Sequence, residues 1–411
     1  MRHEVWQWIR LTNLTLIKNS SLKQTIRRMM PLPLLLACVA TVTVVAQPAG
    51  AQTAPVIGTW KVVASPNGGT QSAGNILLAT AALSSTDAWA VGAEPHQSQF
   101  LTATLAEHWD GTQWSIIPTP LISTPTAQLN SIAVINSSDI WAAGYSDDPN
   151  CLCGKTVVEH WSGSSWTRLT TPNPGVADYL TGIAAISSTD VWAVGYEWIS
   201  NFTELPLLLH YNGTAWKTFN TSQLQFGQVS AVFARATNDV WAVGWTGQLP
   251  NVSALALHWN GTTLTRVAFP TEAGGSIVLK SASGVATNDV WAVGNYEFFG
   301  LNGNLELSAR SYHWNGSHWT AVPVGLGGYS FLDSVSALAT DDVWAVGEGM
   351  VFPQPSELQV TFHWDGTKWS NVPNPEQGVL NGISALSTNE AWAVGDGFTT
   401  PGTYTLHFTV P

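Results

Sequence analysis

The sequence predicts an all-β fold, a seven-bladed β-propeller of four-stranded antiparallel blades, closed by an N-terminal strand that completes the last blade. Three observations lead to this prediction: a repeated motif, a composition rich in turn residues, and a strand-like segment ahead of the first repeat. The motif reads Asp-Val-Trp-Ala-Val-Gly at residues 190–195, and its copies recur every 48 to 53 residues. A period near 50 residues is typical of repeat architectures. The copies are centred on Trp89, Trp141, Trp192, Trp241, Trp291, Trp344 and Trp392.

The composition agrees with many short strands and turns. Only 10% of the 411 residues are charged, while 36 are glycine and 22 are tryptophan. This profile disfavours a disordered chain or a helical one. We therefore expect one propeller over residues 52–411, with blades at about residues 73–120, 129–175, 179–222, 227–271, 277–325, 331–376 and 380–411 plus 57–66.

The first 51 residues lie outside the repeat and resemble a secretory leader. Arg27 and Arg28 precede an apolar run over residues 31–46, and small residues follow up to Ala51. A basic segment, a short apolar core and a small-residue end predict a signal peptide, and hence a secreted or cell-surface protein. A second interpretation is a lipoprotein anchored at Cys38. No apolar run reaches 18 residues, so no integral membrane segment is expected after cleavage.

Removal of this leader makes the chain strongly acidic. Residues 1–51 carry six of the 15 basic residues and one of the 27 acidic residues, which leaves a net charge of −17. Such a surface repels nucleic acid and anionic lipid. Cys151 and Cys153 then remain, either as a local disulfide or as two free thiols. Without a nearby histidine they make a poor metal site, so no metal and no cofactor are predicted.

The third repeat shows how one blade is built. Strands are expected over residues 180–186, 191–195, 207–211 and 216–219, with a variable loop that ends near Leu205. Asn212-Gly213 predicts a two-residue type I′ hairpin, which places Tyr211 and Trp216 on one face of the sheet. We expect these aromatic side chains to fill the space between blades. The first strands carry Ala, Gly and Ser because the backbones crowd near the axis.

The last copy has no fourth strand after Phe408. The segment over residues 58–66 resembles the fourth-strand segment over residues 366–373. An N-terminal strand that completes the last blade closes the ring and removes an exposed sheet edge.

The repeat unit resembles a kelch repeat. The likeness rests on an apolar strand that ends in Gly, an aromatic residue followed by Asp/Asn-Gly, a Trp, and a Pro-rich exit such as residues 172–174. It covers residues 58–411, although the strands here end in a single Gly instead of the kelch pair. Bacterial exported proteins with a DVWAVG repeat are more similar still. The resemblance implies a propeller but no single activity, because kelch-like propellers include partner-binding proteins and a copper oxidase.

One repeated constellation suggests chemistry. An acid opens each second strand and a histidine closes each third strand, as in Asp190 and His210, so both lie at one end of the blade. A catalytic pair is one interpretation. A pair present seven times favours a structural role, because catalysis needs a single asymmetric site. Copper chemistry is disfavoured, since the opposite face offers only His96.

The opposite face varies from blade to blade and is the predicted ligand face. Insertions confined to one face usually mark the binding face of a repeat protein. The loops between strands two and three hold aromatic residues among carboxylates, although these rings can also pack inward to order their own loops. The predicted ligand-binding arc comprises Tyr196, Trp198, Trp245, Tyr296, Phe298 and Phe299.

These patterns predict a secreted binding or scaffold module for a glycan, peptide or protein partner, which we expect to be monomeric. The alternative is a glycan-active hydrolase or lyase with paired loop carboxylates near the axis, about 5–10 Å apart. Nucleic acid is not an expected partner.

Overall fold

The computed structural model describes residues 58–68, 74–96, 98–147, 153–200, 203–221, 223–224, 226–248, 251–299, 305–326, 329–350, 357–375, 378–397 and 402–411. The chain divides into two compact units, Met1–Ala49 and Gly50–Pro411. The predicted signal peptide and Cys38 lie outside the described residues. Among the residues described, none belongs to a helix with the length and hydrophobicity needed to span a membrane.

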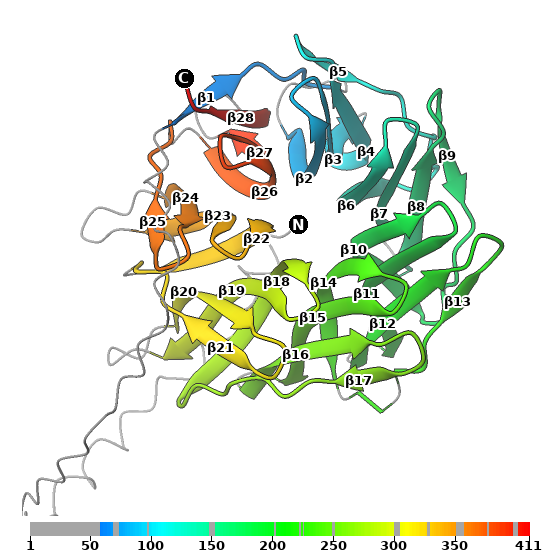
Figure 1. Cartoon of the computed structure of the whole chain (residues 1–411). Coiled ribbons are helices and arrows are strands. Elements are labelled where there is room, and N and C mark those ends of the chain that lie inside the picture. The colour runs from blue at the N-terminus through cyan, green and yellow to red at the C-terminus, as the bar shows by residue number, and fades with distance from the viewer. Residues whose placement is uncertain are drawn as a thin grey trace, which may run out of the picture. The chain divides into compact units, whose positions relative to one another are not determined.

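The described part of the Gly50–Pro411 unit is built of 28 β-strands that form seven blades (Figure 1). Blade 1 comprises β2 (Ile76–Ser84), β3 (Asp87–His96), β4 (Ser98–Trp109) and β5 (Trp114–Ile116). Blade 2 comprises β6 (Thr126–Asn136), β7 (Asp139–Asp147), β8 (Lys155–Trp161) and β9 (Trp166–Leu169). Blade 3 comprises β10 (Ala177–Ser187), β11 (Asp190–Ser200), β12 (Thr203–Tyr211) and β13 (Trp216–Thr218). Blade 4 comprises β14 (Gly227–Ala236), β15 (Asp239–Gln248), β16 (Asn251–Trp259) and β17 (Leu264–Arg266).

The remaining blades repeat this order. Blade 5 comprises β18 (Gly275–Ala286), β19 (Asp289–Phe299), β20 (Leu305–Trp314) and β21 (Trp319–Val322). Blade 6 comprises β22 (Ser330–Ala339), β23 (Asp342–Met350), β24 (Glu357–Trp364) and β25 (Trp369–Asn371). Blade 7 comprises β26 (Gly378–Ser387), β27 (Glu390–Gly397), β28 (Thr403–Thr409) and the N-terminal β1 (Thr59–Val63). Five blades are separate sheets, and blades 1 and 2 are joined by one parallel pair, Thr102 and Thr126.

The N-terminal strand completes the last blade, as the sequence predicted. Strand β1 pairs with β28 in antiparallel register, and Trp60 lies opposite Phe408 (Figure 1). The Trp60 ring also meets Trp344 of blade 6 edge-on at 5.8 Å. Blades 7 and 1 are joined where Asn381 Nδ2 donates to Leu77 O at 3.0 Å. The predicted all-β propeller fold is therefore confirmed.

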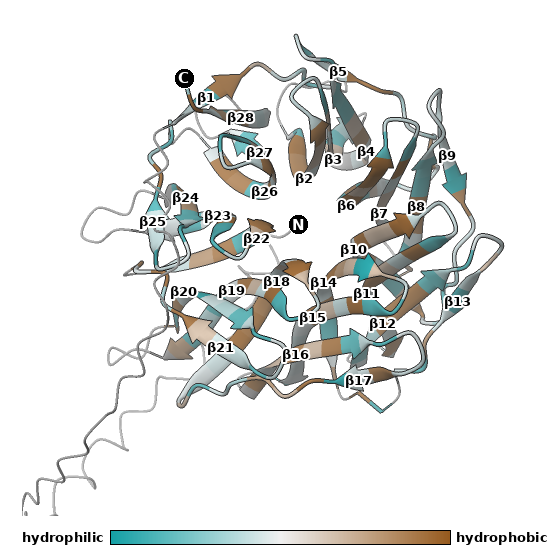
Figure 2. Ribbon diagram, viewed as in Figure 1, coloured by the Kyte–Doolittle hydropathy of each residue, from teal (hydrophilic) through white to brown (hydrophobic). Residues whose placement is uncertain are grey.

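The motif tryptophans form the core between blades. Each is at most 2% exposed and packs against aromatic residues of the next blade. Trp192, for example, lies 5.7 Å from Trp259 of blade 4, and Phe219 stacks on it at 5.0 Å. Hydrophobic stretches accordingly run along the strands of the blades (Figure 2). Since aromatic side chains bury roughly 150–250 Å² each, these contacts dominate blade packing.

The glycine that ends each motif sits opposite a β-bulge. In blade 3 the bulged residue is Thr181, between the paired residues Leu180 and Gly182. A Cβ atom at Gly195 would lie 1.9 Å from the carbonyl oxygen of Tyr179, which no side chain tolerates. The motif therefore ends in glycine because the inner strand approaches the second strand too closely there.

Small residues on the inner strands serve contact between neighbouring blades. A Cβ atom at Gly182 would lie 3.2 Å from the Cα atom of Ala231 in blade 4. Serine hydroxyls on these strands accept hydrogen bonds from the next blade, as where Ile183 N donates to Ser131 Oγ at 3.1 Å. The crowding inferred from the sequence is thus observed.

The hairpin between the third and fourth strands differs from the prediction. Tyr211 lies directly opposite Trp216, so the connection over residues 212–215 has four residues instead of two. The Asn212 side-chain oxygen accepts hydrogen bonds from Thr214 N at 3.1 Å and Ala215 N at 3.0 Å. The predicted type I′ turn was wrong because this side-chain cap stabilises a longer turn, in which Gly213 has a φ of 88°.

Each blade has two different ends. We call the end with the strand 1–2 turn and this hairpin the turn end, and the end where strands two and three join the tip end. In blade 3 the predicted loop up to Leu205 was wrong, because β11 and β12 stay paired out to Ser200 and Thr203. The ladder therefore extends beyond the motif, with an irregularity at Ile199 between the paired residues Trp198 and Ser200.

Candidate ligand-binding face

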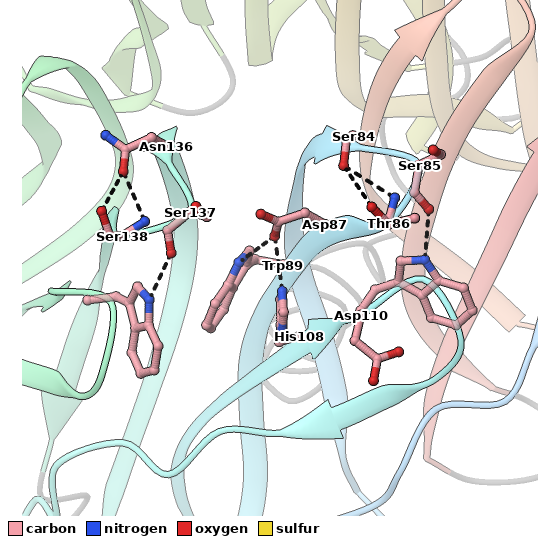
Figure 3. A network of polar contacts seen from close by, with 12 residues as sticks. Ser84, Ser85, Thr86, Asp87, Trp89, His108, Asp110, Asn136, Ser137 and Ser138 are labelled. Atoms are coloured by element: carbon pink, nitrogen blue, oxygen red, sulfur yellow. Dashed lines mark hydrogen bonds and ion pairs between the residues drawn. The ribbon is translucent and has the colours of Figure 1, made fainter.

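The turn end carries the same polar network in every blade. Each third-strand histidine places Nε2 2.8–3.0 Å from the acid that opens strand two. In blade 1 Asp87 accepts from His108 and also from Trp89 Nε1 at 3.2 Å, and the His108 ring lies on the Trp89 ring (Figure 3). The predicted hydrogen bond between acid and histidine is confirmed. Its sevenfold repetition supports a role in holding strands two and three together.

At the tip end, the predicted arc residues lie on strands and not on loops. Tyr196 and Trp198 belong to β11, Trp245 belongs to β15, and Tyr296 and Phe298 belong to β19. Phe299 ends β19, and its side chain lies outside the described part of the structure. Strand alternation places Tyr196 and Trp198 on one face of blade 3. The period of two in this segment was the sequence signal for a strand.

The arc residues differ in burial. Tyr196, Trp198, Trp245 and Phe298 are partly buried, whereas Tyr296 is only 8% exposed. The Tyr296 hydroxyl donates to Ala273 O at 2.7 Å, and its ring stacks on Phe298 at 5.3 Å. This burial favours a structural role for Tyr296.

The surroundings of Tyr296 order the connection between blades 4 and 5. Arg310 lies over the Tyr296 ring at 4.9 Å and donates to both carboxylate oxygens of Glu272 at 2.8–3.0 Å. Tyr312 donates to the same carboxylate at 2.7 Å. These hydrogen bonds lower the pKa of Glu272 in spite of its partial burial.

Blades 2 and 3 bring together a tyrosine cluster that sequence reasoning missed in part. Tyr179 of β10 stacks on Tyr196 at 5.0 Å and meets Tyr145 of β7 edge-on at 4.9 Å. The Tyr179 hydroxyl donates to Asp147 Oδ2 at 2.9 Å, and burial together with this carboxylate raises the Tyr179 pKa. Tyr179 escaped notice because the inner strand was expected to start at Leu180, whereas it starts at Ala177.

Two carboxyl groups form the next rung of this ladder, on the opposite face of blade 3 from Tyr179 and Tyr196. Asp178 of β10 pairs with Glu197 of β11, and cross-strand partners point to the same face of a sheet. Asp178 is fully buried, and its Oδ1 accepts from Gly175 N at 3.0 Å. Burial raises the pKa of both groups. The hydrogen bond from Gly175 N and the positive charge of Lys155 make the rise smaller for Asp178, whereas the negative charge of Asp178 raises the pKa of Glu197 further. Sequence reasoning also missed Asp178.

Further acids with raised pKa values lie at the tip end of other blades. Glu204 of β12 accepts from Gln228 Nε2 of blade 4 at 2.9 Å, and burial raises the pKa of Glu204. Burial likewise raises the pKa of Glu297 in β19, against the hydrogen bond from Asn295 and the charge of Lys280. Carboxyl groups with perturbed pKa values gather at functional sites, so the tip end is a candidate binding site.

The inner strands of blades 5 and 6 carry an ion pair. Lys280 Nζ of β18 lies 2.7 Å from Asp333 Oδ1 of β22, and Lys280 also lies 4.1 Å above the Phe331 ring. Asp333 is therefore already paired with a cation.

Across the ranges that the structure describes, His, Cys, Asp and Glu form no cluster able to hold a metal ion. Cys153 is disulfide-bonded, which excludes the predicted free-thiol alternative for this residue, and Cys151 lies outside the described residues.

An open groove of about 500 Å³ differs from the tip end in the chemistry of its lining. It is lined by the hairpin residues Thr214 to Trp216 of blade 3 and by Leu169 to Pro172 of blade 2. The groove contains no ionisable carboxyl and no member of the predicted arc. We therefore place the candidate site at the tip end, where perturbed acids and aromatic rings meet.

Two carboxyls in the core depart from the repeat. Glu107 and Glu159 stand immediately before the third-strand histidines, where the other blades carry Leu209, Leu257, Tyr312, Phe362 and Leu406. Both are fully buried, and burial raises each pKa to about 8. Glu107 Oε2 accepts from Ser65 Oγ at 2.5 Å, and Arg168 lies near Glu159.

Known proteins resemble this chain in fold and not in sequence. No family profile matches it, and no curated protein matches it. A structure of YCF48 bound to D1 peptide is similar with a TM-score of 0.55 and 13% identity over 89% of this chain and 100% of that chain. YCF48 from Cyanidioschyzon merolae gives a TM-score of 0.51 and 15% identity over 85% of this chain and 98% of that chain.

A third similar structure is an enzyme. The GH74 xyloglucanase from Xanthomonas campestris gives a TM-score of 0.55 and 11% identity over 85% of this chain, which spans 53% of that chain. Identities this low show the fold alone. Fold and blades thus define a tryptophan-rich β-propeller protein, and the kelch-like resemblance stays a prediction.

Proposed function

We propose that this β-propeller is a binding module that takes up a peptide or protein partner at the tip end of blades 2 to 4. The observation that carries the proposal is the stacked pair Tyr179 and Tyr196 together with Asp147, whose carboxylate accepts from the Tyr179 hydroxyl at 2.9 Å. Aromatic faces and carboxylates in one place suit a ligand with cationic or amide groups. The fold relative YCF48, whose structure holds a peptide, supports a peptide ahead of a glycan.

The test compares the native chain with a Trp198→Ala/Trp245→Ala variant on peptide and glycan arrays. Loss of a stacking aromatic should weaken binding by about 1–2 kcal/mol, which corresponds to roughly 5- to 30-fold in Kd. Leu121→Ala is the control, because Leu121 is 80% exposed in the connection between blades 1 and 2. Equal binding by the native chain and the double variant would overturn the role of Trp198 and Trp245.

A glycan-active hydrolase is the second candidate. Two adjacent carboxyls with raised pKa values, Asp178 and Glu197, are the observation that favours it, since glycosidases use a protonated acid beside a carboxylate. Hydrolysis of an oligosaccharide panel by the native chain, lost in both Asp178→Asn and Glu197→Gln, would establish this function. Peptide binding without hydrolysis would reject it.

Export is part of the proposal. A leader with Arg27, Arg28 and an end near Ala51 should be removed, so the secreted chain should begin near Gln52. Mass spectrometry of the exported protein measures this directly, and an intact N-terminus would contradict it. A lipid-modified Cys38 at the new N-terminus would instead indicate the lipoprotein alternative.

A further inference from the structure

Two grooves adjoin the end of strand β9, the outermost strand of blade 2. The larger groove, of about 500 Å³, is lined by residues 169–172 and by Tyr211 and residues 214–216 of blade 3. The smaller groove, of about 320 Å³, is lined by residues 168–171 and by Lys155, among others. Residues 169–171 line both grooves, so the two lie side by side along one segment of the chain.

The smaller groove lies at the edge of the sheet. Arg168 and Leu169 are neighbours in β9, so their side chains point to opposite faces of blade 2. Both residues line this groove, which therefore borders the edge of the strand instead of one face. Among the described strands, β9 pairs with β8 alone. Such an edge strand leaves N–H and C=O groups free on its outer side, where an extended peptide can add as a further strand.

The segment that follows β9 is held in place by hydrogen bonds. Thr156 N donates to Asn173 Oδ1 at 2.8 Å, and the hydroxyls of Thr156 and Thr171 lie 2.7 Å apart. Asn173 Nδ2 also donates to Thr171 O at 3.1 Å. The walls of both grooves are therefore preformed, which lowers the entropy cost of binding a ligand.

The larger groove has an apolar wall. The ring centroids of Tyr211 and Trp216 lie 5.3 Å apart, and both side chains pack, as Leu169 does, against the core between blades 2 and 3. Pro172 and the exposed Ala215 belong to the same lining. Aromatic and aliphatic groups of this kind suit an aliphatic side chain of a ligand.

The smaller groove carries two exposed cations, Lys155 and Arg168. The lysine and arginine ion pairs among the described residues are formed by Arg235, Lys280 and Arg310. The acids whose pKa values respond to these two cations, Asp178 and Glu159, are fully buried, and burial raises both pKa values. A buried carboxyl that keeps its proton does not neutralise a cation, so the groove attracts an anionic group.

We propose that this edge of blade 2 is a second docking site, which takes up an extended peptide with alternating acidic and aliphatic residues. The main chain of the peptide pairs with the free edge of β9, and its side chains alternate between the two sides. The aliphatic residues contact Tyr211 and Trp216, and the acids contact Lys155 and Arg168. This site shares no residue with the tip-end site proposed above.

The probe is a fluorescent decapeptide, four Glu-Leu pairs between two serines, titrated against the purified full chain by fluorescence anisotropy. Two matched peptides replace all glutamates by lysine or all leucines by serine. The net charge of −12 attracts the lysine peptide at long range, so a preference for glutamate requires local cations. We expect the glutamate–leucine peptide to bind at least about tenfold more tightly than either matched peptide. Equal or tighter binding of the lysine peptide would overturn the proposal, as would no binding of the glutamate–leucine peptide.

Backbone methylation tests the pairing with β9. Only every second N–H of an added strand faces its neighbour, so methylation of the glutamate nitrogens and methylation of the leucine nitrogens should differ in effect. One methylated peptide should bind about tenfold more weakly, and the other should keep the affinity of the parent peptide. The same result for both methylated peptides would reject strand addition.

Variants locate the site. Lys155→Ser/Arg168→Ser and Ala215→Glu should each raise the Kd of the glutamate–leucine peptide about tenfold. Arg266→Ser/Lys368→Ser, at exposed cations of blades 4 and 6, and Thr263→Glu, at the hairpin position of blade 4 that matches Ala215, are the controls and should leave it unchanged. Thermal melts check that each variant is folded. An equal loss in the controls would mean non-specific attraction and would reject the site.

One further variant separates this site from the tip end. Trp198→Ala/Trp245→Ala should bind the glutamate–leucine peptide with the Kd of the native chain. Weaker binding by this folded variant would place the peptide at the tip end and overturn the second site. A tip-end ligand found on the arrays, with no binding of the probe peptide, would leave the proposed function in place and reject this site alone.

Discussion

The two ends of the blades follow different rules. At the turn end, seven histidine–acid pairs have nearly the same geometry, at 2.8–3.0 Å. At the tip end, the described residues of the blades differ: blade 3 stacks two tyrosines and pairs two acids on the next rung, and blade 5 buries Tyr296 under Arg310. A network that recurs in every blade stabilises the common scaffold, whereas contacts unique to one or two blades can recognise a ligand. The predictions below test this division.

The largest effect is expected from removal of the closing strand. Deletion of residues 52–66 takes away β1 and with it the contacts of Trp60 with Trp344 and Phe408. Loss of a buried tryptophan alone costs about 3–5 kcal/mol, and exposure of the β28 edge adds to this. Thermal unfolding should lose its cooperative transition or shift to much lower temperature. An unchanged melting temperature would show that β1 is not part of the scaffold.

Two tryptophans on strand β11 compare the ends within one strand. Trp192 is 1% exposed near the turn end, and Trp198 is partly buried at the tip end. Trp192→Ala should reduce the free energy of unfolding by about 3–5 kcal/mol. Trp198→Ala should reduce it by only about 1–2 kcal/mol, because less surface is lost from the core. Urea denaturation measures both, and equal losses would contradict the division.

The buried acids of blades 1 and 2 should make stability depend on pH. Burial raises the pKa values of Glu107 and Glu159 to about 8 in the folded chain, against an ordinary value of 4.5. Between these two pH values the folded chain binds more protons than the unfolded chain. The stability that these two groups contribute should therefore be greatest below about pH 4.5 and fall as the pH rises to about 8. Between pH 6 and 7 each group should contribute a loss of about 1.4 kcal/mol.

Substitution separates this effect from general charge repulsion. Glu107→Gln/Glu159→Gln should flatten the decline in urea denaturation curves measured from pH 5 to 8. Glu306→Gln, at a partly exposed acid, is the matched control and should keep the native slope. A slope unchanged in the double variant would show that other groups cause it.

The smallest effect is expected at a single histidine–acid pair. His210→Ala removes one hydrogen bond to Asp190 and a ring stacked on Trp192 at 4.5 Å. The loss should be about 1–2 kcal/mol in the free energy of unfolding, with no change in ligand binding. If this variant folds normally but binds ligand more weakly, the turn end takes part in binding, which would contradict its assignment to the scaffold alone.

Much of the scaffold could be predicted from the sequence. The motif tryptophans, the acid–histidine pairs and the small inner-strand residues follow local patterns that repeat, so each copy supports the interpretation of the others. The hairpin was predicted less well. Asn212-Gly213 predicts a turn, but the length of this turn depends on the hydrogen bonds that the Asn212 side-chain oxygen accepts from Thr214 N and Ala215 N.

The tip end could be predicted only in outline. Its aromatic residues were recognised, but Tyr296 is buried, and Tyr179 and Asp178 were assigned to no strand. Repetition gives no help there, because each blade differs and has no second copy to compare.

The sequence by itself determined the number of blades, their four strands and the closing role of residues 58–66, because periodic local patterns specify strands and core-facing side chains. Only the tertiary structure decided which tip residues meet. Asp147 reaches Tyr179 across the boundary between two blades, and Asp178 lies opposite Glu197 only because a bulge at Thr181 sets the register. Contacts across blades depend on register and on strand extension, and neither leaves a periodic trace in the sequence.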